Sequence, residues 1–261
     1  EELRAVLSSI PKPKRKPDNI PARPLPKQLA KETPIIKRQD KGTFPSSSSR
    51  SLAASMEKYK ELYAAGDYGK AFELLHPFVE ANNPQALYLM ADMYFRGLGV
   101  ERDTKQALYL FERSAKSGYA TAQANLALHY MLGKEARKDL EKAHSWALKS
   151  AVQGDTLGQE VMGLIVREKD KSDQGRRQAV KWFRLAAEQG RVGSQMLLGL
   201  GLVSLNPHSK EAWMWVHVAV IRGNKNAKNF LEGVEGYPES SAVDVRDKAY
   251  NCIHQNYQNC E

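Results

Sequence analysis

The chain has 261 residues, 42% of them hydrophobic, which supplies enough apolar material for a folded core. It contains no apolar run of about 18 residues or more, so nothing in the sequence predicts a membrane-spanning helix. The net charge of +9 is concentrated near the start: residues 1–50 hold 12 Lys or Arg against 5 Asp or Glu, whereas the other 211 residues hold 27 against 25. A nucleic-acid-binding domain carries its basic residues on the folded surface, so this distribution argues against specific nucleic-acid recognition.

Residues 1–50 also contain 8 of the 12 prolines. A segment this rich in proline and like charge cannot bury a core, so the sequence predicts a disordered, extended tether there. We expect the tether to bind an acidic partner or a cell-envelope polymer. Because the chain begins with Glu1 rather than Met, we also expect that a preceding segment was removed, either by signal-peptide cleavage or by truncation of the expressed chain.

Small and turn-forming residues then recur with one shared period. Each of three series advances by 36 residues three times and then by 33. A shared period of this length is typical of a solenoid that stacks one helix-pair unit. The three series are Ala71, Ala107, Ala143, Ala179 and Ala212; Asn82, Gly118, Gly154, Gly190 and Gly223; and Ala86, Ala122, Gly158, Ser194 and Ala227.

Within each unit the apolar spacing predicts two helices. In the clearest unit, Asn83 is predicted to cap a helix that starts at Pro84, and Asp103 to cap a second helix that ends at Gly118. Alanine and glycine at the recurring positions let neighbouring helices approach closely. The predicted organisation is a tether over residues 1–50, a solenoid of four to five helix pairs over 51–232, and a C-terminal helix with a cysteine-bearing tail over 233–261.

Two stretches carry a family resemblance. The sequence Ala-Thr-Ala-Gln-Ala-Asn-Leu-Ala-Leu-His-Tyr at residues 120–130 and Trp-Phe-Arg-Leu-Ala-Ala-Glu-Gln-Gly at residues 182–190 resemble the Sel1-like repeat, which is related to the tetratricopeptide repeat. The resemblance implies an all-α fold, a right-handed α/α solenoid that serves as a scaffold or adaptor. Many bacterial members of the family are exported, and the family has no general catalytic residues.

Solenoids bind partners along the inner curve, which the first helix of each pair lines. We therefore predict that a protein partner binds in a concave groove lined by Tyr88, Asp92, Asn125, His129 and Glu160. The later first helices are more apolar, and either an apolar groove for a partner helix or tighter burial explains them; the residues concerned are Val161, Leu164, Ile165, Leu197, Leu200 and Leu202. Three tryptophans share one repeat position and are predicted to pack in the core, namely Trp146, Trp182 and Trp215.

The two cysteines, Cys252 and Cys260, both lie in the last ten residues. Eight residues of continuous helix would separate their Cα atoms by about 12 Å, whereas a disulfide needs them within about 7 Å, so a bridge requires the chain to reverse. A disulfide formed in an oxidising compartment is favoured over two unrelated thiols. A zinc site that used His254 as well would lack a fourth ligand.

The sequence shows no catalytic pattern. The six histidines form no pair spaced by four residues, and the glycines at 97 and 99 lack the third glycine of a phosphate-binding loop. We predict no enzyme activity, no metal and no cofactor. The favoured function is a protein-binding scaffold of an exported bacterial assembly, periplasmic or at the cell surface. The alternatives are a cytosolic adaptor whose basic tail binds nucleic acid or an acidic membrane, and an enzyme or carbohydrate-binding protein that acts on cell-wall material.

Overall fold

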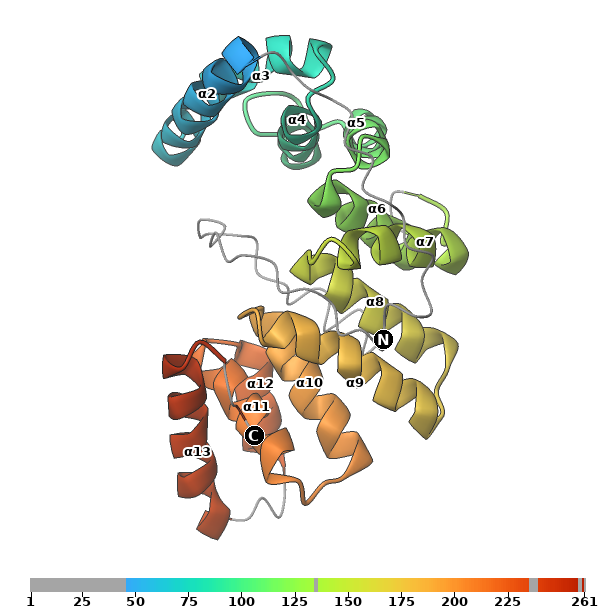
Figure 1. Ribbon diagram of the computed structural model, residues 1–261, viewed down its shortest axis with the longest axis vertical. Coiled ribbons are helices and arrows are strands. Elements are labelled where there is room, and N and C mark those ends of the chain that lie inside the picture. Colours follow the sequence, from blue (N-terminus) through green and yellow to red (C-terminus); the bar gives the residue numbers. More distant parts are fainter. Residues whose placement is uncertain (1–45, 134–135, 235–238, 258–259, 261) are drawn as a thin grey trace. The chain divides into compact units, whose positions relative to one another are not determined.

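The computed structural model describes residues 46–133, 136–234, 239–257 and 260. Over these residues the chain forms twelve α-helices and no strand (Figure 1). The predicted all-α fold is therefore confirmed. The predicted tether lies outside the described residues as far as residue 45, and the first described helix begins at Ser46, so the boundary predicted at residue 50 falls inside that helix.

The helices belong to two compact units that divide after Gln153. The N-terminal unit contains α2 (Ser46–Ala65), α3 (Tyr68–Glu80), α4 (Pro84–Arg96), α5 (Thr104–Lys116), α6 (Ala120–Leu132) and α7 (Leu140–Ala151). The C-terminal unit contains α8 (Thr156–Lys169), α9 (Asp173–Ala187), α10 (Val192–Leu205), α11 (Lys210–Ile221), α12 (Lys225–Gly233) and α13 (Glu239–His254).

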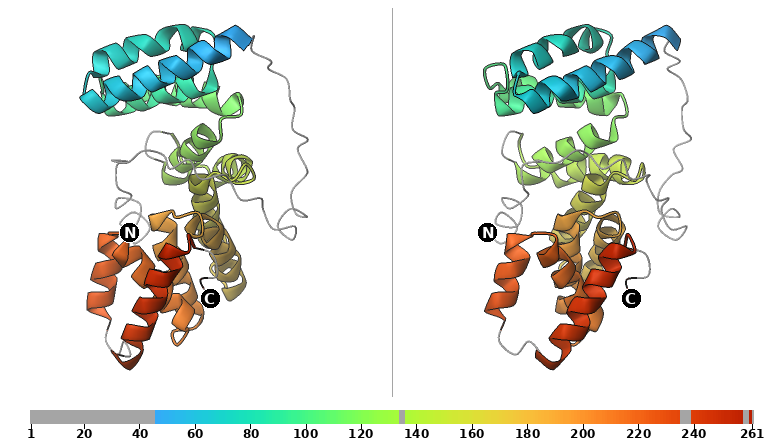
Figure 2. Two further views of the ribbon diagram at one scale, coloured as in Figure 1. Left: turned by 60° about the vertical axis from the view of Figure 1, so that its left-hand side comes forward. Right: turned by 90° about the vertical axis from the view of Figure 1, so that its left-hand side faces the viewer.

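Within each unit, the helices from α2 to α11 pack mainly against their neighbours in the chain. From α4 to α11, the two helices of a pair make the most extensive contacts, as in α4 with α5 and α8 with α9. The second helix of a pair then packs against the first helix of the next, as in α5 with α6 and α9 with α10. Figure 2 shows this stacking for α2, α3 and α4 in the N-terminal unit. Nearest-neighbour packing of this kind is the defining property of a solenoid.

The recurring small residues occupy the positions predicted for them. Every described member of the two alanine-led series is buried, because these residues lie where helices approach one another. The remaining series, which runs from Asn82 to Gly223, follows the second helix of each pair, and all five of its members have positive φ angles, from 53° at Asn82 to 89° at Gly118. Glycine adopts this left-handed conformation without steric cost, which explains its recurrence there.

The predicted helix starts are confirmed at the capping side chains. Asn83 Oδ1 accepts a hydrogen bond from the Ala86 backbone N–H at 3.0 Å, with Pro84 as the first helical residue. Asp103 Oδ1 accepts from the N–H groups of Lys105 and Gln106, both at 2.9 Å. These caps satisfy N–H groups that have no partner inside the helix, so local sequence sets where α4 and α5 begin.

Buried glutamines join helices both within a pair and between successive pairs, a feature that the sequence analysis did not identify. Gln123 and Gln159 stand 36 residues apart, and their Oε1 atoms accept from the Nε2 atoms of Gln153 at 2.8 Å and Gln189 at 2.9 Å. Gln123 Nε2 also donates to the carbonyl oxygen of Ala115 at 3.0 Å. The same 36-residue period therefore carries polar contacts as well as close packing.

Gly163 in α8 provides a direct test of this close packing. A Cβ atom there would lie 2.4 Å from Cε1 of the buried Phe183 in α9, closer than carbon atoms approach. We expect Gly163→Ala to lower the free energy of unfolding by about 1–2 kcal/mol, because overpacking outweighs the gain in helix propensity. The control is Gly69→Ala in α3, where a Cβ atom meets nothing within 4 Å. It should leave stability unchanged or raise it by up to about 1 kcal/mol in urea denaturation, and equal effects would contradict the packing argument.

The C-terminal unit ends differently from the stacked pairs. Helix α13 packs against α11 more extensively than α12 does. Figure 2 shows α12 and α13 at the end of this unit. After α13 the chain reverses through Asn256 and Tyr257, whose φ angles are 50° and 62°. This reversal brings the Cα atoms of Cys252 and Cys260 to 5.0 Å, and the two sulfur atoms are bonded to each other. The turn also places the Tyr257 ring beside Trp215, with the ring centres 6.4 Å apart.

Candidate partner-binding site

All five side chains predicted to line a groove lie on first helices, but they differ in exposure. Tyr88 and Asp92 on α4 and Asn125 on α6 are half-buried. His129 on α6 is only 9% exposed, and Glu160 on α8 only 1%. Three of the five are therefore accessible to a partner, and two are not.

Glu160 is a packing residue, which corrects its assignment to a partner-binding surface. Its Oε2 accepts from Arg191 Nε at 2.8 Å and from Ser194 Oγ at 2.7 Å, and its Oε1 accepts from Arg191 Nη2 at 3.1 Å. Burial alone would lower the pKa of Arg191, but the adjacent Glu160 carboxylate raises it above its ordinary value. The carboxylate thus joins α8 to the start of α10 inside the C-terminal unit.

His129 is also a packing residue. Its ring centre lies 5.4 Å from that of Phe95 on α4 and 5.8 Å from that of Phe111 on α5.

Asn125 Nδ2 donates to the Thr121 carbonyl oxygen of its own helix at 2.8 Å. The apolar first helices of the C-terminal unit are mainly buried, as the tighter-packing explanation requires: Val161, Leu164, Ile165 and Leu197 are inside, and Leu200 and Leu202 are half-buried.

Four partly exposed side chains of the N-terminal unit form one cluster, which we call the α2–α4 surface: Tyr63 from α2 and Tyr88, Asp92 and Arg96 from α4. Arg96 Nε donates to Asp92 Oδ1 at 2.8 Å, and their side chains are 28% and 19% exposed. Tyr63 is near enough for both charges to affect its ionisation. The cluster therefore joins two first helices through aromatic and charged groups.

Burial decides the ionisation of this surface. It raises the pKa of Asp92 above the ordinary aspartate value of 3.8, outweighing the opposing effect of the Arg96 guanidinium. Burial likewise raises the pKa of Tyr59 beneath the surface and of Tyr63, with Asp92 adding to both shifts. Asp92 is thus a partly dehydrated carboxylate that one arginine only partly compensates.

The raised pKa of Asp92 predicts the sign of its contribution to stability. A carboxyl group whose pKa is higher in the folded than in the unfolded state binds more protons when folded, so its ionisation above pH 3.8 destabilises the fold. We expect Asp92→Asn to change the free energy of unfolding at pH 7 by less than about 1 kcal/mol, in the stabilising direction. The difference between variant and wild type should shrink as the pH falls toward 4. A clear destabilisation at pH 7, measured by urea denaturation, would contradict this assignment.

Aromatic rings hold Tyr63 and Tyr88 of the α2–α4 surface in place. The ring centre of Tyr63 lies 5.6 Å from that of Tyr59 and 5.2 Å from that of Tyr68. The Tyr88 ring centre lies 5.6 Å from that of Phe111 and 5.3 Å from that of Tyr119. The sequence analysis identified Tyr88 and Asp92 but missed Tyr63 and Arg96. The spacing of four residues from Tyr59 to Tyr63, and from Asp92 to Arg96, was the available signal.

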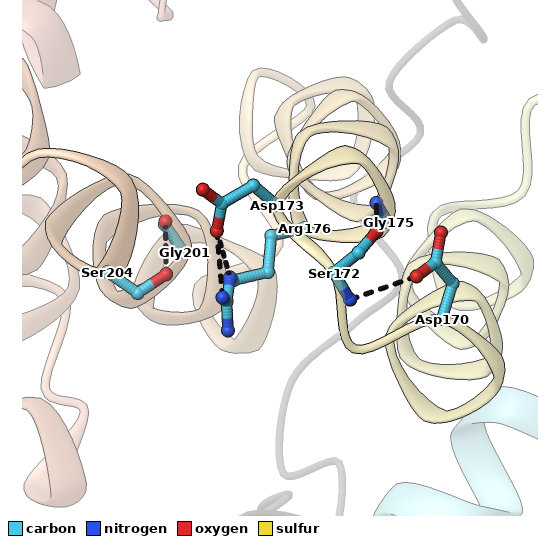
Figure 3. A network of polar contacts seen from close by, with 7 residues as sticks. All are labelled: Asp170, Ser172, Asp173, Gly175, Arg176, Gly201 and Ser204. Carbon is cyan, nitrogen blue, oxygen red and sulfur yellow. Dashed lines mark hydrogen bonds and ion pairs between the residues drawn. The ribbon is translucent and has the colours of Figure 1, made fainter.

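A second polar cluster lies at the turn between α8 and α9 (Figure 3). Asp170 Oδ1 accepts from the Ser172 backbone N–H at 2.9 Å, and Ser172 Oγ accepts from the Gly175 N–H at 3.3 Å. The hydrogen bond to Ser172 lowers the pKa of Asp170. Asp173 pairs with Arg176 one turn further along. These contacts cap the start of α9, so the cluster is explained by helix formation alone.

Among the described residues, no group of three or more His, Cys, Asp or Glu side chains is arranged to hold a metal ion. A search of the same residues finds no helix with the length and hydrophobicity needed to cross a membrane.

The helix pairs coincide with units recognised in other proteins. A family model described as the Sel1 repeat matches residues 84–119, which are α4 and α5, then residues 120–155 and residues 170–190. The crystal structure of a Sel1 repeat protein from Oxalobacter formigenes superposes with a TM-score of 0.58 at 21% identity, covering 75% of this chain and 99% of that one.

Two curated proteins are similar over part of the chain. The chitin synthase regulator SKT5 of Saccharomyces cerevisiae is 28% identical over 120 residues, which is 45% of this chain and 17% of that protein. The uncharacterized protein NMB1327 of Neisseria meningitidis serogroup B is 28% identical over 128 residues, or 49% and 26%. The matched region is thus about a quarter or less of either relative. Together with the helix-pair fold, these matches show that the chain contains Sel1 repeats.

Proposed function

We propose that this protein is a non-enzymatic scaffold of an exported bacterial assembly, periplasmic or at the cell surface, and that it docks a protein partner on the α2–α4 surface. Sel1 repeats generally serve as protein–protein interaction scaffolds, which supports the class of function. The observation that carries the choice of docking site is the partly exposed Asp92–Arg96 pair, which forms one cluster with Tyr63 and Tyr88.

Residue chemistry favours this surface over the others described. Tyrosine and arginine are enriched among the residues that contribute most to binding, because they bury large areas and also form hydrogen bonds. Because these rings pack on one another, they are already immobilised, so the surface loses little side-chain entropy when a partner binds. A partner cation beside Asp92 would further compensate a carboxylate that burial disfavours.

The test compares the intact protein with single variants in crosslinking and capture from the organism that makes it. Tyr63→Ala and Asp92→Asn should each reduce a stoichiometric partner at least tenfold. The matched control is Tyr109→Ala on α5, which removes a tyrosine that is 55% exposed and outside the α2–α4 surface. Capture of the same partner by all four proteins would exclude this surface as the docking site.

The exported location is tested at the cysteines. We expect native protein to contain the Cys252–Cys260 disulfide, so its intact mass should rise by two hydrogen atoms on reduction. Disulfides persist in oxidising compartments, and two free thiols in native material would contradict export. Replacing both cysteines with alanine should lower the free energy of unfolding by about 2 kcal/mol, since the bridge closes a loop with a sequence separation of 8.

A further inference from the structure

The sequence contains one segment whose chemistry matches the α2–α4 surface. Pro21 and Pro24 are the only two prolines in the chain that stand three positions apart. Arg23 lies between them, and Leu-Pro-Lys follows at residues 25–27. Prolines spaced by three favour the polyproline II helix, which has three residues per turn and places both rings on one edge. The segment is therefore a basic polyproline motif.

Such motifs bind aromatic surfaces because the polyproline helix is already extended and loses little entropy on docking. Its proline rings pack against tyrosine side chains, which Tyr63 and Tyr88 supply here from two helices. An arginine in the motif needs a carboxylate beside the rings, and Asp92 stands one helical turn after Tyr88 on α4 and is near enough to Tyr63 to affect its ionisation. The α2–α4 surface provides both requirements in one place.

The length of chain between motif and surface also fits. Lys27 stands 19 residues before Ser46, where α2 begins, and Tyr63 lies 17 residues along that helix. Seventeen helical residues span about 26 Å. A coil of 19 residues has a root-mean-square end-to-end distance of about 24 Å. Effective concentration is highest when linker length matches the span, and reaches the order of millimolar for short linkers.

We propose that residues 21–27 of this chain bind the α2–α4 surface as a polyproline II helix, with Arg23 paired to Asp92, so that the protein occupies its own docking site. This inference rests on the proposed function, because it uses the same surface. A partner must then displace the segment, and a partner that carries a basic proline-rich motif competes most directly. The segment sets a threshold below which weak partners do not bind.

The experiment titrates a fluorescent peptide of residues 19–29 into full-length proteins and follows anisotropy. The Arg23→Ala/Pro24→Ala variant should bind the peptide about tenfold more tightly than wild type, because its surface is no longer occupied from within. Adding Asp92→Asn to this variant should abolish binding. The control is Lys12→Ala/Pro13→Ala, which removes one cation and one proline outside the motif and should behave as wild type.

Two results would overturn self-occupation: no peptide binding to the Arg23→Ala/Pro24→Ala variant, or equal binding to that variant and wild type. Binding that survives Asp92→Asn, with circular dichroism confirming the fold, would place the peptide elsewhere and also overturn it. Partner capture that depends on Tyr63 while the peptide fails to bind would leave the docking function standing. Partner capture that does not depend on Tyr63 would instead contradict the docking function itself. Failure of self-occupation and failure of the docking function therefore give different results.

Discussion

Replacing Glu160 with alanine should lower the free energy of unfolding of the C-terminal unit by about 3–5 kcal/mol. The side chain is almost completely buried, and three hydrogen bonds tie its carboxylate to Arg191 and Ser194. Without it, the Arg191 guanidinium, whose side chain is only 23% exposed, would lose its ion-pair partner and keep only the weaker effect of the Asp155 carboxylate. An unpaired buried charge costs far more than the ion pair contributes in its presence, which is why the expected loss is large.

The matched control for Glu160 is Glu232→Ala in the same unit. Glu232 Oε1 lies 3.6 Å from Lys228 Nζ, and both side chains are more than 60% exposed. Water screens such a pair, so its removal should change stability by less than about 0.5 kcal/mol. Urea denaturation followed by tryptophan fluorescence measures both variants, since α9 and α11 carry Trp182 and Trp215. A loss below about 1 kcal/mol for Glu160→Ala would mean that Arg191 reaches solvent once its partner is gone.

Replacing Trp215 with alanine should also lower the free energy of unfolding by about 3–5 kcal/mol. Trp215 is the largest of the completely buried side chains among the described residues. Its ring stacks at 6.4 Å on Tyr257, which the C-terminal reversal holds against Gly190. Alanine would leave a cavity between α11 and the C-terminal turn, and these elements cannot collapse into it because the turn is tied to α13 through Cys252.

The repeat supplies the control for Trp215. Trp146 occupies the same repeat position in α7 but is only partly buried, with Lys149 Nζ 4.3 Å from its ring centre. Trp146→Ala should therefore cost less than half as much as Trp215→Ala, because less apolar surface is returned to water. Hydrogen exchange should assign each loss to its own unit. Equal losses would mean that repeat position, rather than local burial, sets the contribution of this tryptophan.

Repeat position alone could not identify the exposed site residues. Tyr88 and Glu160 stand at equivalent positions, two residues after Ala86 and Gly158, yet Tyr88 is half-buried and Glu160 is inside. The difference lies with Arg191, which pairs with Glu160 from 31 residues further along the chain. A pattern within one repeat does not report which side chain the next repeat will place beside it.

The burial of His129 could have been predicted from the residues at equivalent repeat positions. Its equivalents one repeat before and one repeat after are Met93 and Ile165, which are both completely buried. Two apolar residues at equivalent positions indicate that His129 faces inward as well. Tyr63, the tyrosine missed from the α2–α4 surface, had no such counterpart, because α2 belongs to a leading pair that precedes the matched repeats.

The sequence by itself determined the helix pairs, their caps and their 36-residue period, because these depend on contacts within a few residues and on small side chains wherever helices meet. It also determined that the two cysteines need a chain reversal before they can bond. Only the tertiary structure decided which first-helix side chains reach the surface, since that depends on partners about 30 residues away. Asp92 remains half-exposed beside an arginine of its own helix, whereas Glu160 is covered by residues of the next first helix and the turn before it.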